Sequence, residues 1–331
     1  MKQKQKIPFT AIKIVVTALL LGVLAFLVYK EWAKIYEMFS RMQVRYFVLA
    51  MALMFVSMFT GFLVWQTAFL ATRVHVHPVS AFRAYFLGLF YNNVLPTSIG
   101  GDVVKVIEMK EMGTPVDTTV SAILIDRVLT LYILIFSSLL FTPLIIRSKI
   151  EAAQVSVIVG AFIIVTMLAA IILYNERTFA LLVRIVRRVI PWKKVSHFII
   201  TVFESFHRLK HKRRFALLMV ICVIVTQTLR ILFNYFIGLA LSLNIALPFY
   251  FVCIPLVTVA TLIPISLSGY GVAELSGAFL FSKLLPGVSY SQGGMLMFTA
   301  HIALLIVNLV CGFAFFIPKR DRTGKRQYVF M

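Results

Sequence analysis

Two short stretches of this chain repeat one pattern of residue types that suits anion binding. The first, LPTSIGGD, covers residues 95–102, and the second, IPISLSGYGVAE, covers residues 263–274. In both, a proline follows an aliphatic residue, a serine stands two residues after the proline and a glycine five residues after it. Each stretch then reaches an acid and a run of residues typical of a helix. The matching pairs are Pro96 and Pro264, Ser98 and Ser266, Gly101 and Gly269, and Asp102 and Glu274.

Proline and glycine give these stretches their chemical meaning. Proline ends an incoming helix and lacks a backbone donor, whereas glycine permits tight turns and close approach of the backbone. A helix that restarts after such a break has unpaired N–H groups at its positive end, which favour an anionic ligand. Paired breaks in the two halves of a membrane protein indicate the binding site of an inverted-repeat transporter, where the breaks meet near the bilayer midplane. The alternative is two surface loops that share these residue types by chance.

Charged residues inside apolar segments form a second group of candidates. A charge at bilayer depth costs roughly 2.5–3.5 kcal/mol on insertion scales, so each one needs a partner or a function. Arg127 lies in the middle of an apolar run, and we expect it to face the interior of the helix bundle. The charges concerned are Arg83, Asp102, Lys105, Asp126, Arg127, Arg230 and Glu274.

Polar residues on two later apolar runs recur at helical spacing. Gln227, Arg230 and Asn234 fall on one stripe that cannot face lipid, and His301 and Asn308 do the same on the last run. A single buried histidine is more often a hydrogen-bonded packing residue than a proton relay, although both roles are open for His301.

The arginines allow two interpretations. Arg127 and Arg230 either bind a phosphate-bearing headgroup or form structural ion pairs with Asp126 and Glu274. We take the polar and glycine residues of both stretches, together with these charges, as the candidate substrate-binding set. The set is Asn92, Asn93, Pro96, Ser98, Gly100, Gly101, Asp102, Lys105, Asp126, Arg127, Arg230, Ser266, Gly269, Gly271 and Glu274.

The elements that must position these residues are apolar helices. Hydrophobic residues make up 61% of the 331 residues, and the mean hydropathy is +0.95. Since apolar runs of about 18 residues or more are typical of membrane spans, we predict an all-α polytopic membrane protein. It has about six full spans and two re-entrant or broken helical hairpins, arranged as an inverted repeat. The spans lie near residues 12–29, 46–70, 119–146, 153–174, 215–241 and 292–317, and the broken segments near 79–112 and 247–285.

The basic residues predict the topology. The net charge is +21, and the stretch from Glu176 to Arg214 contains eleven Lys or Arg residues against two acids. Because short loops rich in Lys and Arg stay on the cytoplasmic side, we place this stretch and both termini in the cytoplasm and the chain in the cell membrane. Residues 179–190, FALLVRIVRRVI, predict an amphipathic helix at the membrane interface. This distribution is not a sign of nucleic-acid binding.

We expect a single integral membrane domain over residues 1–331, because no polar segment is long enough to bury a core of its own. It divides into a first half at 1–174, a basic cytoplasmic linker at 175–214 and a second half at 215–331. The three cysteines form no C-x-x-C or Cys/His cluster, so we expect neither a metal site nor a disulfide framework. We also expect no cofactor, and no G-x-x-x-x-G-K-[ST] loop is present for direct use of ATP.

Three segments carry a family resemblance. NNVLPTSIGGDVVKV resembles the L-P-x-x-x-G-G-D-hydrophobic-x-[KR] motif of the lysylphosphatidylglycerol synthase transmembrane-domain family, also called flippase-like integral membrane proteins. SGYGVAE resembles the second G-x-G-x-x-E motif of that family, and ILIDRVLTL resembles a family helix, with Asp126 where glutamate is more common. The resemblance implies a bundle with two re-entrant elements that translocates an anionic or aminoacylated lipid. Family members that make lysylphosphatidylglycerol carry an additional soluble transferase domain, so for this stand-alone chain we do not expect synthase activity.

These features favour a lipid flippase that acts on an anionic or aminoacylated phospholipid or on a polyprenyl-phosphate-linked lipid. One alternative is an integral membrane transferase that acts on a lipid carrier, although no clear catalytic constellation is present. Another is a non-catalytic partner of a lipid-synthesising enzyme. The expected partners are membrane lipids with anionic headgroups.

Overall fold

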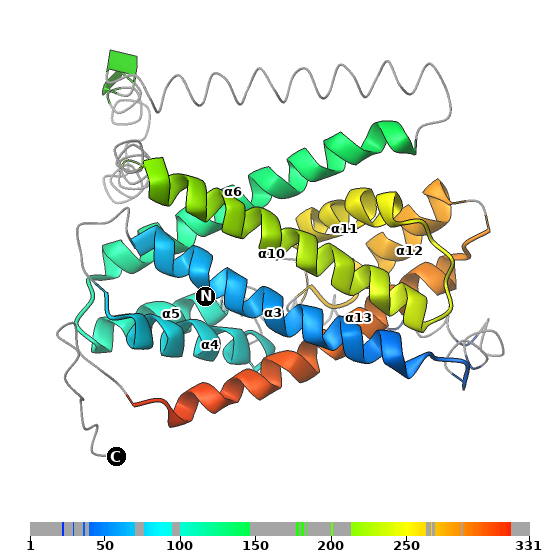
Figure 1. The fold of residues 1–331 in the computed structure, drawn as a ribbon, viewed down its shortest axis with the longest axis horizontal. Helices are drawn as coiled ribbons and strands as arrows, with labels where there is room; N and C mark the ends of the chain where they lie inside the picture. The colour runs from blue at the N-terminus through cyan, green and yellow to red at the C-terminus, as the bar shows by residue number, and fades with distance from the viewer. Residues whose placement is uncertain are drawn as a thin grey trace, which may run out of the picture. The chain divides into compact units, whose positions relative to one another are not determined.

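The structure is a computed structural model that describes residues 40–69, 76–94, 100–145, 213–262, 269–285 and 287–318, with single positions outside these ranges. These residues form α-helices and short 3-10 helices and contain no strand, so the predicted all-α class is confirmed (Figure 1). The α-helices are α3 (Val44–Phe69), α4 (Pro78–Val94), α5 (Gly100–Glu111), α6 (Val116–Phe141), α10 (Arg213–Ala240), α11 (Leu247–Thr261), α12 (Val272–Leu284) and α13 (Tyr290–Val310). The 3-10 helices are η1 (Thr142–Leu144) and η2 (Cys311–Phe316).

Four described helices are long and apolar enough to cross a membrane. They are Val44–Phe69, Val116–Leu144, Arg214–Ala240 and Tyr290–Phe316, and they confirm four of the predicted spans. The predicted spans near 12–29 and 153–174 and the linker at 175–214 lie outside the described ranges.

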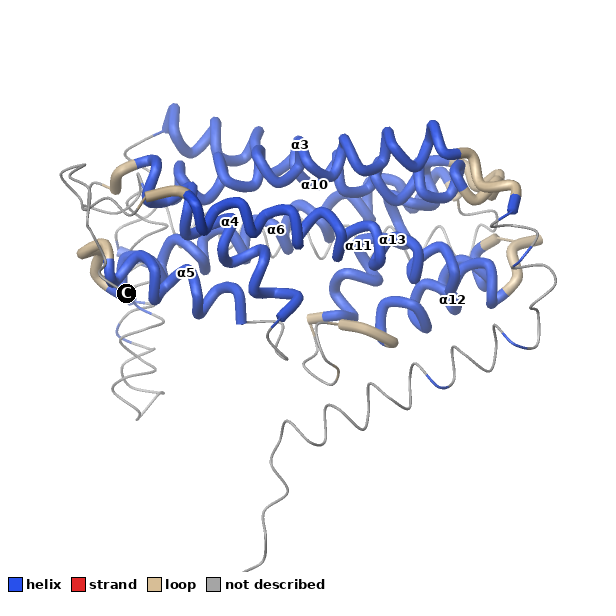
Figure 2. Tube along the Cα trace, turned by 90° about the horizontal axis from the view of Figure 1, so that it is seen from below, coloured by secondary structure: helices blue, strands red, loops and turns tan. Residues whose placement is uncertain are grey.

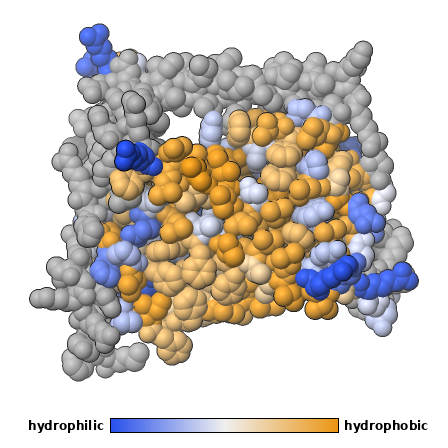
Figure 3. Space-filling view, viewed as in Figure 1, coloured by the Kyte–Doolittle hydropathy of each residue, from blue (hydrophilic) through white to orange (hydrophobic). Residues whose placement is uncertain are grey.

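The surface of these helices is suited to lipid. On α10, large apolar side chains such as Leu217, Leu218 and Ile221 are exposed. Figure 3 shows hydrophobic side chains over most of the described part of the face in view. Water would disfavour so much contiguous apolar surface, whereas hydrocarbon chains solvate it.

Each predicted broken segment consists of two short helices. The first contains α4 and α5, of 17 and 12 residues, and the second contains α11 and α12, of 15 and 13 residues. All four are shorter than the ~20 residues that a full span requires. The re-entrant path and the inverted repeat remain predictions.

The described helices belong to two compact units. Unit 1 comprises Met1–Met58, Phe86–Val104 and Thr228–Phe313, and it therefore contains residues on both sides of each helix break. Unit 2 comprises the remaining Phe59–Tyr85, Lys105–Gln227 and Ala314–Met331. The division into halves that the sequence predicts remains a prediction.

Aromatic packing builds the core of unit 1. Helix α12 packs against both α11 and α13 (Figure 2). The fully buried ring of Tyr250 on α11 lies 5.3 Å from the ring of Phe281 on α12 and 5.5 Å from that of Tyr235 on α10. These contacts fix the ends of α11 and α12 that lie away from the helix break.

Unit 2 has a separate aromatic core. Trp65 of α3 and Tyr85 of α4 are buried, with ring centroids 5.9 Å apart. Helices α3 and α10 are also joined by a hydrogen bond of 2.8 Å from the Thr226 hydroxyl to the Thr60 hydroxyl. A hydroxyl-to-hydroxyl bond satisfies both groups between two apolar helices without a charge.

Candidate functional site

The first helix break is closed by an asparagine. The side-chain Oδ1 of Asn92, near the end of α4, accepts a hydrogen bond of 3.0 Å from the backbone N–H of Gly101, at the start of α5. Glycine is required at this position, because a Cβ atom on Gly101 would lie 2.2 Å from the carbonyl oxygen of Gly88 and 2.3 Å from Asn92 Oδ1. The predicted pair of Asn92 and Gly101 is therefore brought together by the fold, with Gly100 buried beside it.

The second helix break is built from two glycines with left-handed backbone. Gly269 has a φ of 83° and Gly271 a φ of 80°, which side chains other than glycine rarely adopt. Gly271 is the N-cap of α12, and its N–H donates a hydrogen bond of 2.6 Å to Glu274 Oε2. The predicted residues Gly269, Gly271 and Glu274 thus form one compact helix start.

Glu274 also has a partner that the sequence does not predict. Its carboxyl group is fully buried, and Oε1 lies 2.5 Å from Nδ1 of His301 on α13. The ring of Tyr270 lies against the His301 ring, with centroids 4.8 Å apart. The i to i+7 spacing of His301 and Asn308 marked a polar face on α13, but it did not indicate which helix this face meets.

Both breaks differ in one respect from the expected anion site. The sequence predicts unpaired N–H groups at the helix starts, but Asn92 accepts a hydrogen bond from the Gly101 N–H and Glu274 accepts one from the Gly271 N–H. Side-chain capping satisfies such groups without an external ligand. An anionic ligand therefore needs a donor other than these two N–H groups.

Lys105 has an aromatic environment in unit 2. The lysine is 5% exposed, and its Nζ lies 4.9 Å from the ring centroid of Tyr85 and 5.8 Å from that of Trp65. The faces of both rings attract the ammonium group, which offsets part of its desolvation. On the same helix, Asp102 of unit 1 is also buried.

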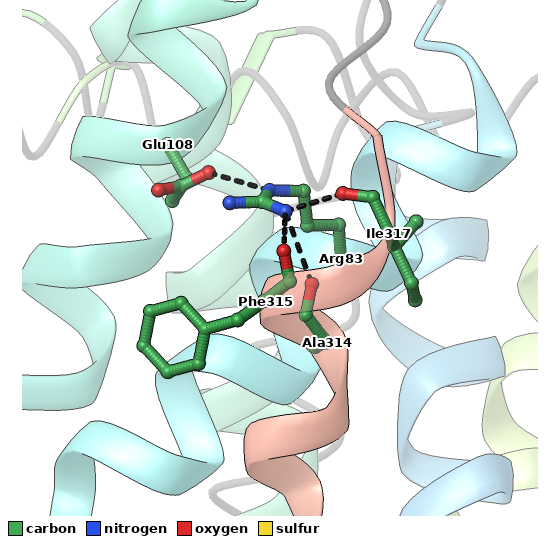
Figure 4. A network of polar contacts seen from close by, with 5 residues as sticks. All are labelled: Arg83, Glu108, Ala314, Phe315 and Ile317. Atoms are coloured by element: carbon green, nitrogen blue, oxygen red, sulfur yellow. Dashed lines mark hydrogen bonds and ion pairs between the residues drawn. The ribbon is translucent and has the colours of Figure 1, made fainter. Parts of the chain in front are cut away.

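Arg83 forms a polar network with Glu108 and with the end of the last helix (Figure 4). Its Nε donates to Glu108 Oε2 at 3.1 Å, and its Nη1 donates to the carbonyl oxygens of Ala314, Phe315 and Ile317. The last carbonyl groups of a helix have no partner within the helix, so Arg83 acts as a side-chain cap for the end of η2. The sequence identified Arg83 only as a charge within an apolar segment.

The expectation for Arg127 is wrong. Its side chain is exposed on α6 and does not face the interior, whereas the neighbouring Asp126 is half-buried. Arg127 lies near the middle of the apolar span Val116–Leu144, as the sequence predicts, but on a face of α6 that the described helices do not bury.

Asp126 takes part in a polar chain of unit 2 that links α6 to α10. Gln227 Nε2 donates to Thr130 Oγ1, and Thr130 Oγ1 lies 3.4 Å from Asp126 Oδ1, to which it donates. Both distances are long for such bonds, so this chain holds α6 and α10 together only weakly.

Arg230 is different from the other buried cations. Its side chain is half-buried, and its Nε is shielded from solvent without a hydrogen-bond acceptor among the described residues. The Asn234 side chain donates a hydrogen bond of 2.9 Å to the backbone carbonyl of Arg230, and this bond does not involve the guanidinium group. The predicted ion pair between Arg230 and Glu274 is not formed, because Glu274 is held by Gly271 and His301.

The remaining predicted residues are described only in part. Ser266 is 3% exposed, and its hydroxyl group has no hydrogen-bond partner within the described ranges. Pro96, Ser98 and the side chain of Asn93 are not among the residues that the structure describes. Whether both breaks contribute to one binding site therefore remains a prediction.

The fold and the buried charges at its helix breaks define a multi-pass integral membrane protein with polar groups inside the apolar layer. The chain belongs to the family described as lysylphosphatidylglycerol synthase TM region, whose model matches residues 10–312. The family resemblance of the two glycine motifs is thereby confirmed.

The chain is also similar to the UPF0104 membrane protein PH1989 of Pyrococcus horikoshii. The two are 26% identical over 291 residues, which cover 80% of this chain and 85% of that protein. No solved structure matches the chain.

Proposed function

We propose that this protein moves a lipid with a phosphate-bearing headgroup across the cell membrane, with both termini and residues 175–214 in the cytoplasm. The candidate substrates are an anionic or aminoacylated phospholipid and a polyprenyl-phosphate-linked lipid, which share a phosphate group and long apolar tails. Membership of a family named for the membrane region of a lipid synthase supports a lipid-related role.

The observation that carries this proposal is the shielded Nε of Arg230, which has no hydrogen-bond acceptor among the described residues. Arg230 lies ten residues before the end of α10 at Ala240, about 15 Å along the helix. A charge at such a depth is costly, and a buried donor without an acceptor adds roughly 1–3 kcal/mol. A phosphate oxygen offers this donor a charge-assisted hydrogen bond, and the planar guanidinium matches phosphate in a bidentate geometry.

The other buried cations are less suitable for this role. Arg83 is committed to Glu108 and to carbonyl groups of the last helix, and Lys105 lies over the rings of Trp65 and Tyr85. Withdrawing either residue to bind a ligand would cost these contacts. Arg230 can bind phosphate without losing a side-chain hydrogen bond to the described part of the chain.

Reconstituted liposomes test the proposal. The purified protein is placed in liposomes that contain a fluorescent phosphatidylglycerol, an aminoacylated phosphatidylglycerol or a short polyprenyl phosphate, and movement is followed by quenching of the outer leaflet. A fluorescent glycosyl diacylglycerol serves as the lipid without phosphate. We expect movement of at least one phosphate-bearing lipid, and a rate about tenfold or more lower for Arg230→Gln, since loss of one charge-assisted contact costs roughly 1.5–3 kcal/mol.

Arg45→Gln is the matched control. Arg45 belongs to the same unit and is exposed, with contacts only to the adjacent Gln43 and Tyr46 side chains. The Arg45→Gln protein should transport lipid at the rate of the unmodified protein. If a well-folded Arg230→Gln protein moves phosphate-bearing lipids at the full rate, Arg230 does not bind the headgroup and the proposal loses its main support.

A further inference from the structure

A carboxyl group and an imidazole form a buried pair in unit 1 that the proposed transport of lipid does not by itself require. Glu274 Oε1 and His301 Nδ1 are 2.5 Å apart, which is a short charge-assisted contact. The Glu274 side chain is fully buried, whereas the His301 side chain is 18% exposed. A proton can therefore reach the pair only through the imidazole.

The pair has two charge states that differ by one proton. With a proton on Nδ1 only, the imidazole is neutral and donates to the carboxylate, and the pair carries one negative charge. A second proton on Nε2 gives imidazolium and carboxylate, and the pair is neutral overall. Burial disfavours the state with net charge, so binding of this proton favours the conformation that encloses the pair.

Few other titratable groups face the pair among the described residues. Tyr270 in the turn before α12 lies against the His301 ring. On α11, Tyr250 packs against Phe281, which is two turns along α12 from Glu274. The remaining titratable residues of the three helices are Cys253 on α11, Lys283 on α12 and Tyr290 on α13. Lys283 and Tyr290 lie more than two helical turns from Glu274 and His301, respectively, along their helices.

The position of the pair links its charge to the shape of the second helix break. The same carboxyl group accepts from His301 through Oε1 and from the Gly271 N–H through Oε2. Gly271 is the N-cap of α12 and has a φ of 80°, so this hydrogen bond stabilises the turn where α12 begins. A change of charge on the pair therefore acts directly on the start of α12 and on its contact with α13.

We propose that Glu274 and His301 form a proton-binding site, and that one proton is bound from one side of the membrane and released to the other during each cycle of lipid movement. The inference rests on the proposed function and adds the proton as a second transported species. No redox or covalent step is involved, because the proton binds to His301 Nε2 and leaves from the same atom. The proton gradient is then the energy source for lipid movement.

The first arm of the test measures protonation without transport. The full chain is labelled with nitrogen-15 at its six histidines, placed in nanodiscs of phosphatidylcholine and titrated from pH 5 to 9 by NMR. The His301 signals are identified by their loss in His301→Gln. We expect Nε2 of His301 to gain a proton within this range and the Glu274→Gln substitution to change the pH range of that step. A His301 signal that is constant over the whole range would overturn the proton-binding site.

The second arm measures lipid movement in the liposome assay with and without a pH difference of about two units across the membrane, which is worth about 2.7 kcal/mol per proton. We expect the gradient to raise the rate of the unmodified protein at least fivefold and His301→Gln to abolish this difference. His77→Gln is the matched control, since His77 immediately precedes α4 and its Nδ1 accepts a hydrogen bond from the nearby Val79 N–H. It should keep the full response.

The two arms separate the inference from the proposed function. Lipid movement that does not respond to the gradient would overturn the coupling and leave the proposed function intact. No movement of any lipid under either condition would contradict the proposed function, and the titration alone would then decide whether the pair binds a proton.

Discussion

Substitution of Arg83 tests whether the end of the last helix is held by a single side chain. Arg83 is 7% exposed and donates to one carboxylate and three backbone carbonyl groups. In Arg83→Gln the shorter amide cannot make these four bonds together. Removal of one partner of a buried ion pair costs roughly 3–5 kcal/mol, and this range already includes part of the lost hydrogen bonding. We therefore expect a loss of about 3–5 kcal/mol, and not the larger sum of four separate bonds.

The measurement is thermal unfolding in a mild detergent, for Arg83→Gln, Glu108→Gln and the double variant. At roughly 2–4 °C per kcal/mol, Arg83→Gln should lower the midpoint by about 6–20 °C. Because Arg83 also caps η2, Glu108→Gln should cost less than Arg83→Gln, and the double variant should resemble Arg83→Gln alone. A midpoint within 2 °C of the unmodified protein in Arg83→Gln would show that the carbonyl groups at 314–317 find other donors, and would refute a capping role.

Two further predictions concern the first helix break. Gly101→Ala should destabilise the protein markedly, because the new Cβ would lie 2.2 Å from a backbone oxygen. Gly22→Ala is the control, since its Cβ would meet nothing within 4 Å, and it should unfold at the temperature of the unmodified protein. Asn92→Asp retains an acceptor for the Gly101 N–H, whereas Asn92→Leu leaves this N–H unpaired at a cost of roughly 1–3 kcal/mol. The thermal midpoint of Asn92→Asp should therefore be closer to that of the unmodified protein than the midpoint of Asn92→Leu. Equal midpoints for the two Asn92 variants would show that this hydrogen bond does not stabilise the break.

The four described membrane spans could be predicted because hydropathy alone indicates them. The run near 215–241 corresponds to the apolar span Arg214–Ala240, and the run near 46–70 corresponds to Val44–Phe69. Every backbone group must be satisfied within the hydrocarbon layer, so a long apolar run has few options besides a helix. Proline and glycine likewise marked both helix breaks, since each residue restricts or frees the backbone locally.

The partners of the buried charges could not be predicted in this way. Arg83 is bonded to backbone carbonyl groups more than 200 residues further along the chain, and backbone acceptors carry no residue-specific signal. The contact of Glu274 with His301 depends on how α12 and α13 face each other, which spacing within either helix does not determine. Arg127 shows a related limit, because the position of a charge along an apolar run does not determine whether its face of the helix is buried.

Arg83 and Arg230 show how the partners of a buried cation separate a structural role from a binding role. The guanidinium group of Arg83 is stabilised within the folded protein, so an anion would gain little by displacing its present acceptors. Arg230 has a shielded Nε that no described group satisfies, and its desolvation is therefore already part of the free energy of the unliganded fold. An anion that reaches Arg230 meets a donor that has less hydration left to lose, which raises the net gain from the contact. A neutral headgroup without a strong acceptor would leave the same donor unpaired, so under the proposed function we expect phosphate-bearing lipids to be preferred over neutral glycolipids.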